Sequence, residues 1–421
     1  MSQDASTAIA EAFSEEWGQL VATLIARTGD WDLAEECAQQ AFAEAVRRWP
    51  RDGVPRQPGA WLTTVARNRA VDRLRHERMK EQRLRAATDL MSTDEPPDEP
   101  DPSVSEDDES GIVDDRLRLM FTCCHPALPL DGRVALTLRT LAGLTTAEIA
   151  RAFFVPEATM AKRLVRAKGK IAHARIPYRV PPAHVLPERT GGVLAVLYLL
   201  FSEGYKASAG PDLVRTDLCR EAIRLARVLD ALMPDEPEAA GLLALMLFQH
   251  SRRLARVDAN GDLVTLDEQD RSRWDRGEIN EASALLDHAL ARQSAGPYQL
   301  QSAIAACHAQ SRHPDATDWA RIATLYERLL EVMPQPIVAL NHAIAVAMAQ
   351  GPDQGLLLVD ELDASGALSG YHLLHATRAD LLRRLGRVAE ARAAYLQALE
   401  LTASDAERRF LIRRLEETAP V

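Results

Sequence analysis

The sequence of 421 residues lacks several features that mark particular classes of protein. Its five cysteines have no regular spacing, which argues against a disulfide framework and favours a reducing compartment. Its longest apolar runs, such as VLAVLYLLF, are about half as long as a membrane span. No basic stretch followed by an apolar run opens the chain, so no signal peptide is apparent. We therefore expect a cytoplasmic protein that does not span a membrane.

Patterns typical of catalysis and metal binding are lacking too. The chain has no G-x-x-x-x-G-K-[ST] motif for nucleotide phosphates and no evident Ser/His/Asp or paired-carboxylate arrangement. The segment MFTCCHPAL contains Cys123, Cys124 and His125, but no second Cys/His pair follows at zinc spacing, so core packing is the better interpretation. We expect a binding protein rather than an enzyme, with no cofactor and no metal.

What is present is a helix-forming composition. Ala, Leu, Arg and Glu dominate, runs of β-branched residues are scarce, and Gly and Pro fall mostly between periodic segments. The length exceeds that of a single hydrophobic core, so two to four domains are expected. The sequence predicts an all-α protein.

Charge is distributed very unevenly along this acidic chain, whose formal net charge is −11. Residues 61–85 contain eight basic and three acidic residues, a net charge of +5. Residues 86–115 contain twelve acidic residues and no Lys or Arg, whereas residues 151–175 contain seven basic residues and one acid, a net charge of +6. Two basic segments separated by an acidic one favour nucleic-acid binding more than the total charge does.

These patterns divide the chain into four parts. Residues 8–85 have the spacing of amphipathic helices, interrupted by the Pro/Gly loop PRDGVPRQP. Residues 86–113 are acidic, proline-rich and aperiodic, which predicts a disordered linker. Residues 114–180 form a second small helical domain, and residues 190–421 read as helix pairs.

The C-terminal part shows spacing close to that of tetratricopeptide repeats. In HATRADLLRRLGRVAEARAAYLQALEL, small and apolar residues recur at the positions that such repeats use, and Gly351 precedes Gly386 by 35 residues, close to the 34-residue period. We expect about three to five such helix pairs between Gly192 and the C-terminus.

The second basic segment fits a helix-turn-helix. Thr145 or Thr146 can cap a first helix, with Glu148 near the acid position of a capping box, and a short turn with Pro156 precedes a second helix that opens near Glu157. The apolar stripe of this second helix is Met160, Leu164, Ala167 and Ile171. The residues left facing outward, as on a DNA-reading helix, are Thr159, Lys162, Arg163, Arg166 and Lys170.

Two other segments allow two interpretations each. PGAWLTTVARNRAVDRLR combines aromatic, amide and Arg groups that suit unstacked bases, but a solvated basic face with a buried Trp fits equally well. EQDRSRWD gathers Glu268, Asp270, Arg271, Trp274 and Asp275 with a further arginine. It predicts either a ligand pocket or polymerase contact, or a salt-bridge network between helices.

Three motifs in order resemble those of bacterial RNA polymerase sigma factors of the sigma-70 family, in its extracytoplasmic-function group. They are LAEECAQQAFAEA, PGAWLTTVARNRAVDRLR and LTTAEIARAFFVPEATMAKRLVRAKGKI. The resemblance covers roughly residues 8–176. The remainder, with YLLFSEGY and EQDRSRWD, resembles the tetratricopeptide-like extension of one subgroup, in which it is needed for activity.

The resemblance implies roles for individual positions. Positions that match contacts with the β′ clamp helices of core polymerase are Glu35, Glu36, Gln39 and Phe42. Positions that match melting and holding of the −10 element are Trp61, Arg67, Asn68 and Arg75, with a flipped base read by the loop 51–58. Positions that match reading of the −35 element are Thr159, Lys162, Arg163 and Arg166.

We therefore expect an alternative sigma factor that directs promoter recognition, melting and initiation. Its expected partners are core polymerase, through the β′ clamp helices and the β flap, promoter DNA, and a regulatory protein on the C-terminal repeats. The acidic linker is expected along a basic channel of the polymerase. The alternative is a helix-turn-helix regulator whose repeat domain senses a ligand or partner without replacing a sigma factor.

Overall fold

A computed structural model describes residues 3–89, 115–153, 155–205, 216–258, 264–292, 295–402 and 405–418. Within these ranges the regular structure is helical and no strand is present, which confirms the all-α prediction. The predicted acidic linker lies outside them from residue 90 onward. None of the described helices is long and apolar enough to cross a bilayer. The chain divides into two compact units, residues 1–196 and 197–421.

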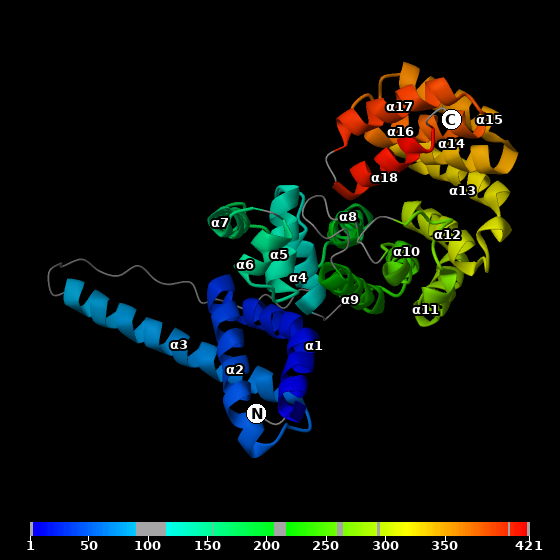
Figure 1. Cartoon of the computed structure of the whole chain (residues 1–421). Coiled ribbons are helices and arrows are strands. Elements are labelled where there is room, and N and C mark those ends of the chain that lie inside the picture. Colours follow the sequence, from blue (N-terminus) through cyan, green and yellow to red (C-terminus); the bar gives the residue numbers. More distant parts are fainter. Residues whose placement is uncertain are drawn as a thin grey trace. The chain divides into compact units, whose positions relative to one another are not determined.

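The first unit is built from helices of very different length (Figure 1). They are α1 (Gln3–Thr28), α2 (Trp31–Asp52), α3 (Pro58–Asp89), α4 (Asp115–Cys123), α5 (Leu130–Thr140), α6 (Thr146–Ala152) and α7 (Glu157–His173), and α8 (Leu186–Tyr205) begins in it. Helix α3 continues four residues beyond the domain boundary expected at residue 85.

Helices α1, α2 and α3 pack against one another around aromatic and small side chains. Trp17 of α1 and Leu62 of α3 are fully buried at the centre of this packing. Helix α2 starts where the Asp30 carboxylate accepts the backbone N–H groups of Asp32 (2.9 Å) and Leu33 (3.0 Å), a typical N-cap. These contacts fix where α2 begins and therefore which of its side chains face α1.

Helix α2 ends later than the sequence pattern predicted. The predicted loop began at Pro50, but the helix continues through that proline to Asp52. Proline in the last turns removes a single hydrogen bond, and the carbonyl that loses it belongs to the exposed residue Val46, which water can reach. The chain turns instead at Gly53, whose φ of 86° lies in the region that favours glycine.

The two adjacent cysteines lie at the end of α4 and pack into the interior against α5. Cys123 and Cys124 are buried, with their sulfur atoms 3.2 Å from Thr140 Oγ1 and 3.7 Å from Thr137 Oγ1 of α5. The prediction that this pair serves core packing is confirmed.

The second unit consists of helices in which each packs on the next along the chain (Figure 1). They are α9 (Thr216–Leu232), α10 (Pro237–His250), α11 (Arg276–Leu290), α12 (Pro297–Gln310), α13 (Trp319–Val332), α14 (Pro336–Gln350), α15 (Pro352–Ala364), α16 (His372–Arg384), α17 (Val388–Leu401) and α18 (Asp405–Glu416). Short 3₁₀ turns occur as η1 (Arg253–Ala255), η2 (Arg271–Arg273) and η3 (Pro314–Ala316).

Helix pairs of the kind expected from the repeat spacing are present in this unit. Gly351, at φ of 120°, follows α14 directly, and Gly386, at φ of 74°, lies two residues after the end of α16. Ala391, Tyr395 and Ala398 of α17 are buried in one cluster with side chains of α14, α15 and α16. The sequence period therefore located the turns between helices as well as the face of α17 that packs inward.

Candidate nucleic-acid interface

Helix α6 begins with the capping box that the sequence predicted. The Thr145 hydroxyl accepts the Glu148 backbone N–H (3.2 Å), and the Glu148 carboxylate accepts the Thr145 backbone N–H (2.8 Å). The backbone and hydroxyl hydrogen bonds of Thr145 lower the pKa of the Glu148 carboxyl. The box fixes the start of α6 and hence the angle at which the turn leads into α7.

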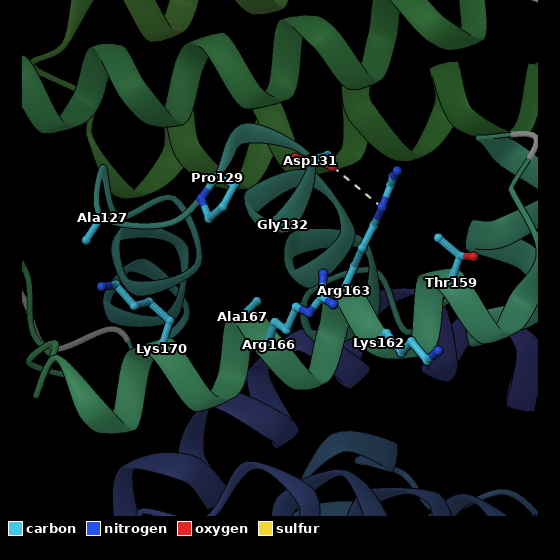
Figure 2. A pocket seen from close by; sticks show the side chains of 10 residues that line it. All are labelled: Ala127, Pro129, Asp131, Gly132, Thr159, Lys162, Arg163, Arg166, Ala167 and Lys170. Atoms are coloured by element: carbon cyan, nitrogen blue, oxygen red, sulfur yellow. Dashed lines mark ion pairs between the residues drawn. The ribbon is translucent and has the colours of Figure 1, made fainter.

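Helix α7 is amphipathic as predicted. Its buried residues are Met160, Leu164, Ala167 and Ile171, each less than 8% exposed. Figure 2 shows the opposite face, where basic side chains extend from α7 beside the loop before α5. Residues of α7, of this loop and of α5 line a hollow of about 760 Å³. The predicted DNA-reading residues that line it are Thr159, Lys162, Arg163, Arg166 and Lys170.

One basic residue that lines this hollow forms an ion pair with a carboxylate. Arg163 Nε lies 3.5 Å from Asp131 Oδ2 at the start of α5, and the Arg163 side chain is 31% exposed (Figure 2). Lys162 and Arg166 are exposed and make no ion pair with a described residue. These two side chains, like the exposed Lys170, are therefore available donors on α7 for phosphates or base edges.

The other predicted DNA site lies at the start of α3. Trp61 is half-buried and sets its ring edge-on to Trp49 of α2, with 5.7 Å between the ring centroids. It lines a shallow hollow of about 510 Å³ with Arg56, Gln57 and Thr64. Of the predicted loop 51–58, residues 51–52 belong to α2 and Pro58 opens α3, so the loop is 53–57. An aromatic ring at the edge of a shallow hollow suits the capture of an unstacked base.

The arginines of α3 fall into two groups. Arg73 forms an ion pair with Glu36 of α2, and Arg69 lies 4.0 Å from Glu44. Arg67 and Arg75, predicted as DNA contacts together with Asn68, are exposed and pair with no described carboxylate. The sequence counted all of these charges alike, but the structure leaves only some of them to attract a phosphate backbone.

The four positions predicted to dock on core polymerase differ in exposure. Glu36 and Gln39 are exposed on α2, although Glu36 is engaged with Arg73. Phe42 is 6% exposed and packs with its ring centroid 5.0 Å from that of Phe13. Phe42 therefore belongs to the interior of the first unit in this structure.

Glu35 is also buried, and its charge is compensated from the helix-turn-helix. It is 5% exposed, with Oε2 2.9 Å from Arg139 Nε and Oε1 2.8 Å from Lys168 Nζ. Lys168 reaches Asp32 as well, at 2.7 Å. Sequence reasoning singled out neither Arg139 nor Lys168, since their partners lie more than 100 positions away and a basic residue at the back of α7 has no local signal.

Other contacts join the same two groups of helices. Trp17 Nε1 donates a hydrogen bond to the Thr140 carbonyl (3.1 Å), and the Tyr178 hydroxyl donates to the Ala22 carbonyl (2.9 Å). A Cβ on Gly18 would lie 2.9 Å from a backbone oxygen at the end of α5, so this approach requires glycine. Helices α1–α3 and α4–α7 thus form one compact unit in which Glu35 is enclosed.

No cluster of three or more metal-binding side chains occurs among the described residues.

Three family models match successive parts of the chain. Sigma-70 region 2 matches residues 13–79, sigma-70 region 4 matches residues 118–171, and a family of unknown function matches residues 189–290. The first two matches fall on α1–α3 and α4–α7, the helices that carry the two basic surfaces.

Similar proteins extend this comparison. An uncharacterized protein of Rhizobium meliloti is 44% identical over 401 residues, covering 95% of this chain and 93% of its own length. An ECF RNA polymerase sigma factor of Mycobacterium tuberculosis and a probable RNA polymerase sigma-C factor of Mycobacterium bovis are each 27% identical over 161 residues, 38% of this chain and 80% of theirs. With regions 2 and 4 in order and a helical extension after them, the chain belongs to the sigma-70 family as an alternative sigma factor, which directs promoter recognition and transcription initiation.

Proposed function

We propose that the exposed face of α7 reads the −35 element. The observation that carries this proposal is the burial of the apolar stripe of α7, which turns its basic side outward. Arg166 can grip a guanine edge and Lys162 can neutralise a phosphate, while Arg163 is free to do so once it leaves Asp131. Thr159 and Lys170 extend the same face toward the two ends of the helix.

The start of α3 and the loop 53–57 hold the −10 element. Trp61 presents a ring beside the hollow, and stacking of an unpaired base on such a ring is worth about 1–3 kcal/mol. Arg67, Asn68 and Arg75 lie exposed further along α3, where they can follow the backbone of the melted strand. Melting is driven by capture of the unstacked bases rather than by a chemical step.

Helix α2 contacts the β′ clamp helices of core polymerase, and the second basic segment, residues 151–175, contacts the β flap. Glu36 and Gln39 are the exposed groups that support this proposal. Glu35 can take part only when Arg139 and Lys168 release its carboxylate, and Phe42 acts by holding α2 against α1. The C-terminal helices bind a regulatory protein.

In vitro transcription with purified core polymerase tests these assignments. Lys162→Glu/Arg166→Glu reverses two free charges on α7, and we expect promoter-specific transcripts to fall by at least about thirtyfold, two contacts at roughly 1–3 kcal/mol each. Affinity for core polymerase is expected to stay unchanged. Arg179→Glu, an exposed position outside α7, is the matched control and should leave transcription near the wild-type level.

The alternative function gives a different result in the same assay. A helix-turn-helix regulator that does not replace a sigma factor would shift duplex DNA on its own and add no promoter-specific initiation to core polymerase. Loss of core binding together with promoter binding in the α7 variant would also contradict the proposed division between α2 and α7.

A further inference from the structure

A basic hollow lies in the second unit, between the turn that leads into α11 and the end of α12. Its volume is about 740 Å³, and Arg271, Arg276, Arg312 and His313 line it. Asp270 is the single carboxylate among the described residues of the lining. Part of the EQDRSRWD segment therefore forms a wall of a cavity, in addition to the ion pairs that the segment makes elsewhere.

Arg271 is the fixed element of this wall. It is 6% exposed, and its Nη1 donates to the carbonyls of His308 (2.9 Å) and Ser311 (2.7 Å) at the end of α12. Its guanidinium lies 4.9 Å from the centre of the Trp274 ring. A helix C-terminus and a ring face stabilise a cation only partly, and no described carboxylate forms an ion pair with Arg271.

Polar atoms in this region are also left unsatisfied. Arg271 Nε and Gln269 Oε1 are buried and have no hydrogen-bond partner among the described residues. Burial, together with the charges of Arg252 and Arg276, lowers the pKa of Arg271, and Arg252 and Arg271 join burial in lowering the pKa of His308 to about 4. Buried polar groups without hydrogen-bond partners, next to positive charge that no ion pair neutralises, are typical of a site that binds an anion.

Several other arginines of this unit are paired with acids. Arg253, which flanks the segment, contacts both Asp275 (3.1 Å) and Glu278 (3.1 Å). In contrast, Arg276 and Arg312 are exposed and make no ion pair with any carboxylate in the described ranges.

Asp270 forms no ion pair with these arginines, and its Oδ1 instead accepts the Ser272 N–H (2.9 Å) and hydroxyl (2.6 Å) and caps η2. Three guanidinium groups thus converge on one hollow with a single, otherwise engaged, carboxylate.

We propose that this hollow binds a small phosphorylated polar molecule, with Arg271, Arg276 and Arg312 holding the phosphate. Guanidinium groups match the geometry of phosphate oxygens, and the volume lies in the range of small-molecule sites. The remaining walls offer the Gln310 amide and the Ser272 hydroxyl, which suit the hydroxyl groups of a sugar. Among the described residues that line the hollow, none carries an aromatic ring except His313 and none has a large apolar side chain, which disfavours a nucleobase or an apolar peptide anchor.

Calorimetry on the full chain tests the proposal with ribose 5-phosphate as the probe, in about 0.15 M NaCl so that long-range attraction is screened. We expect saturable binding with one site per chain. Arg276→Gln/Arg312→Gln removes the two exposed guanidinium groups and should weaken binding at least about tenfold. Arg328→Gln/Arg392→Gln removes the same charge from exposed positions of α13 and α17 outside the hollow, and should weaken it less than about twofold.

Three results would each overturn the proposal. The first is the absence of saturable binding by wild-type protein. The second is an equal loss of affinity in both double variants, which would mean that only net charge matters. The third is sulfate binding as tight as that of ribose 5-phosphate, which would mean that the hollow attracts any anion. Because the measurement uses neither polymerase nor DNA, its outcome is independent of the sigma-factor assignments.

Discussion

Substitution of Lys168 by Gln tests how firmly the helix-turn-helix covers α2. The Lys168 side chain is 17% exposed and contacts Glu35 at 2.8 Å and Asp32 at 2.7 Å. Asp32 is 87% exposed, so its ion pair with Lys168 contributes at most about 1 kcal/mol to the free energy that holds the two groups of helices together. Glu35 is buried, but its ion pair with Arg139 remains after the substitution. Loss of the contact between Lys168 and Glu35 should therefore cost less than the roughly 3–5 kcal/mol of a fully broken buried pair. We take about 2 kcal/mol for the two contacts together.

That figure predicts a change in polymerase affinity. If the two helix groups must separate before α2 can dock, a loss of about 2 kcal/mol favours separation by roughly thirtyfold. Lys168→Gln should then tighten binding to core polymerase by up to that factor, measured by fluorescence anisotropy without DNA. Lys162→Gln removes the same charge from the exposed side of α7 and should leave this affinity unchanged.

The reasoning is refuted if Lys168→Gln binds core polymerase no more tightly than wild type or Lys162→Gln. A zero-length carbodiimide cross-link checks the starting state directly, since Asp32 and Lys168 lie 2.7 Å apart. Wild-type protein should yield the 32–168 cross-linked peptide pair, and core polymerase should reduce its yield.

Three smaller effects follow from the helix-turn-helix. Thr145→Ala removes the cap of α6 and should cost about 1 kcal/mol of unfolding free energy by urea denaturation, and no loss would contradict the capping box. The lowered pKa of Glu148 stabilises the fold above its unfolded pKa of about 4.3 and ceases to do so as pH falls through the folded pKa, so the stability difference between wild type and Glu148→Gln should shrink progressively as pH falls below the unfolded pKa. Asp131→Asn releases Arg163 and should raise affinity for promoter DNA with core polymerase about two- to fivefold, whereas a decrease would assign Asp131 a positioning role.

Predictions that rest on residues close together in the sequence agreed best with the structure. The capping residues of α6, the start of α7 at Glu157 and the four-residue stripe of α7 involve neighbours within four positions, where hydrogen bonds and helical spacing act directly. The end of α2 was wrong by a few residues because proline was given more weight than Gly53. A late-turn proline costs little when the carbonyl it leaves unpaired faces water.

The choice among charged residues was not accessible from sequence. Arg67 and Arg73 lie on one helix with the same local chemistry, but only Arg73 meets a carboxylate, because α2 passes beside it. Glu35 and Glu36 are adjacent, and helical geometry sends one toward α5 and α7 and the other toward α3. Which of the two is enclosed depends on contacts between segments more than 100 residues apart.

The amino-acid sequence alone determined the helical class, the order of the two basic segments and the outward face of α7, because helix periodicity and capping depend on residues a few positions apart. Tertiary structure alone decided that Glu35 is enclosed by Arg139 and Lys168, and that three arginines without an ion pair to any described carboxylate line one hollow. Burial and ion pairing depend on which segments the fold brings within a few ångströms, and that proximity leaves no trace in local spacing.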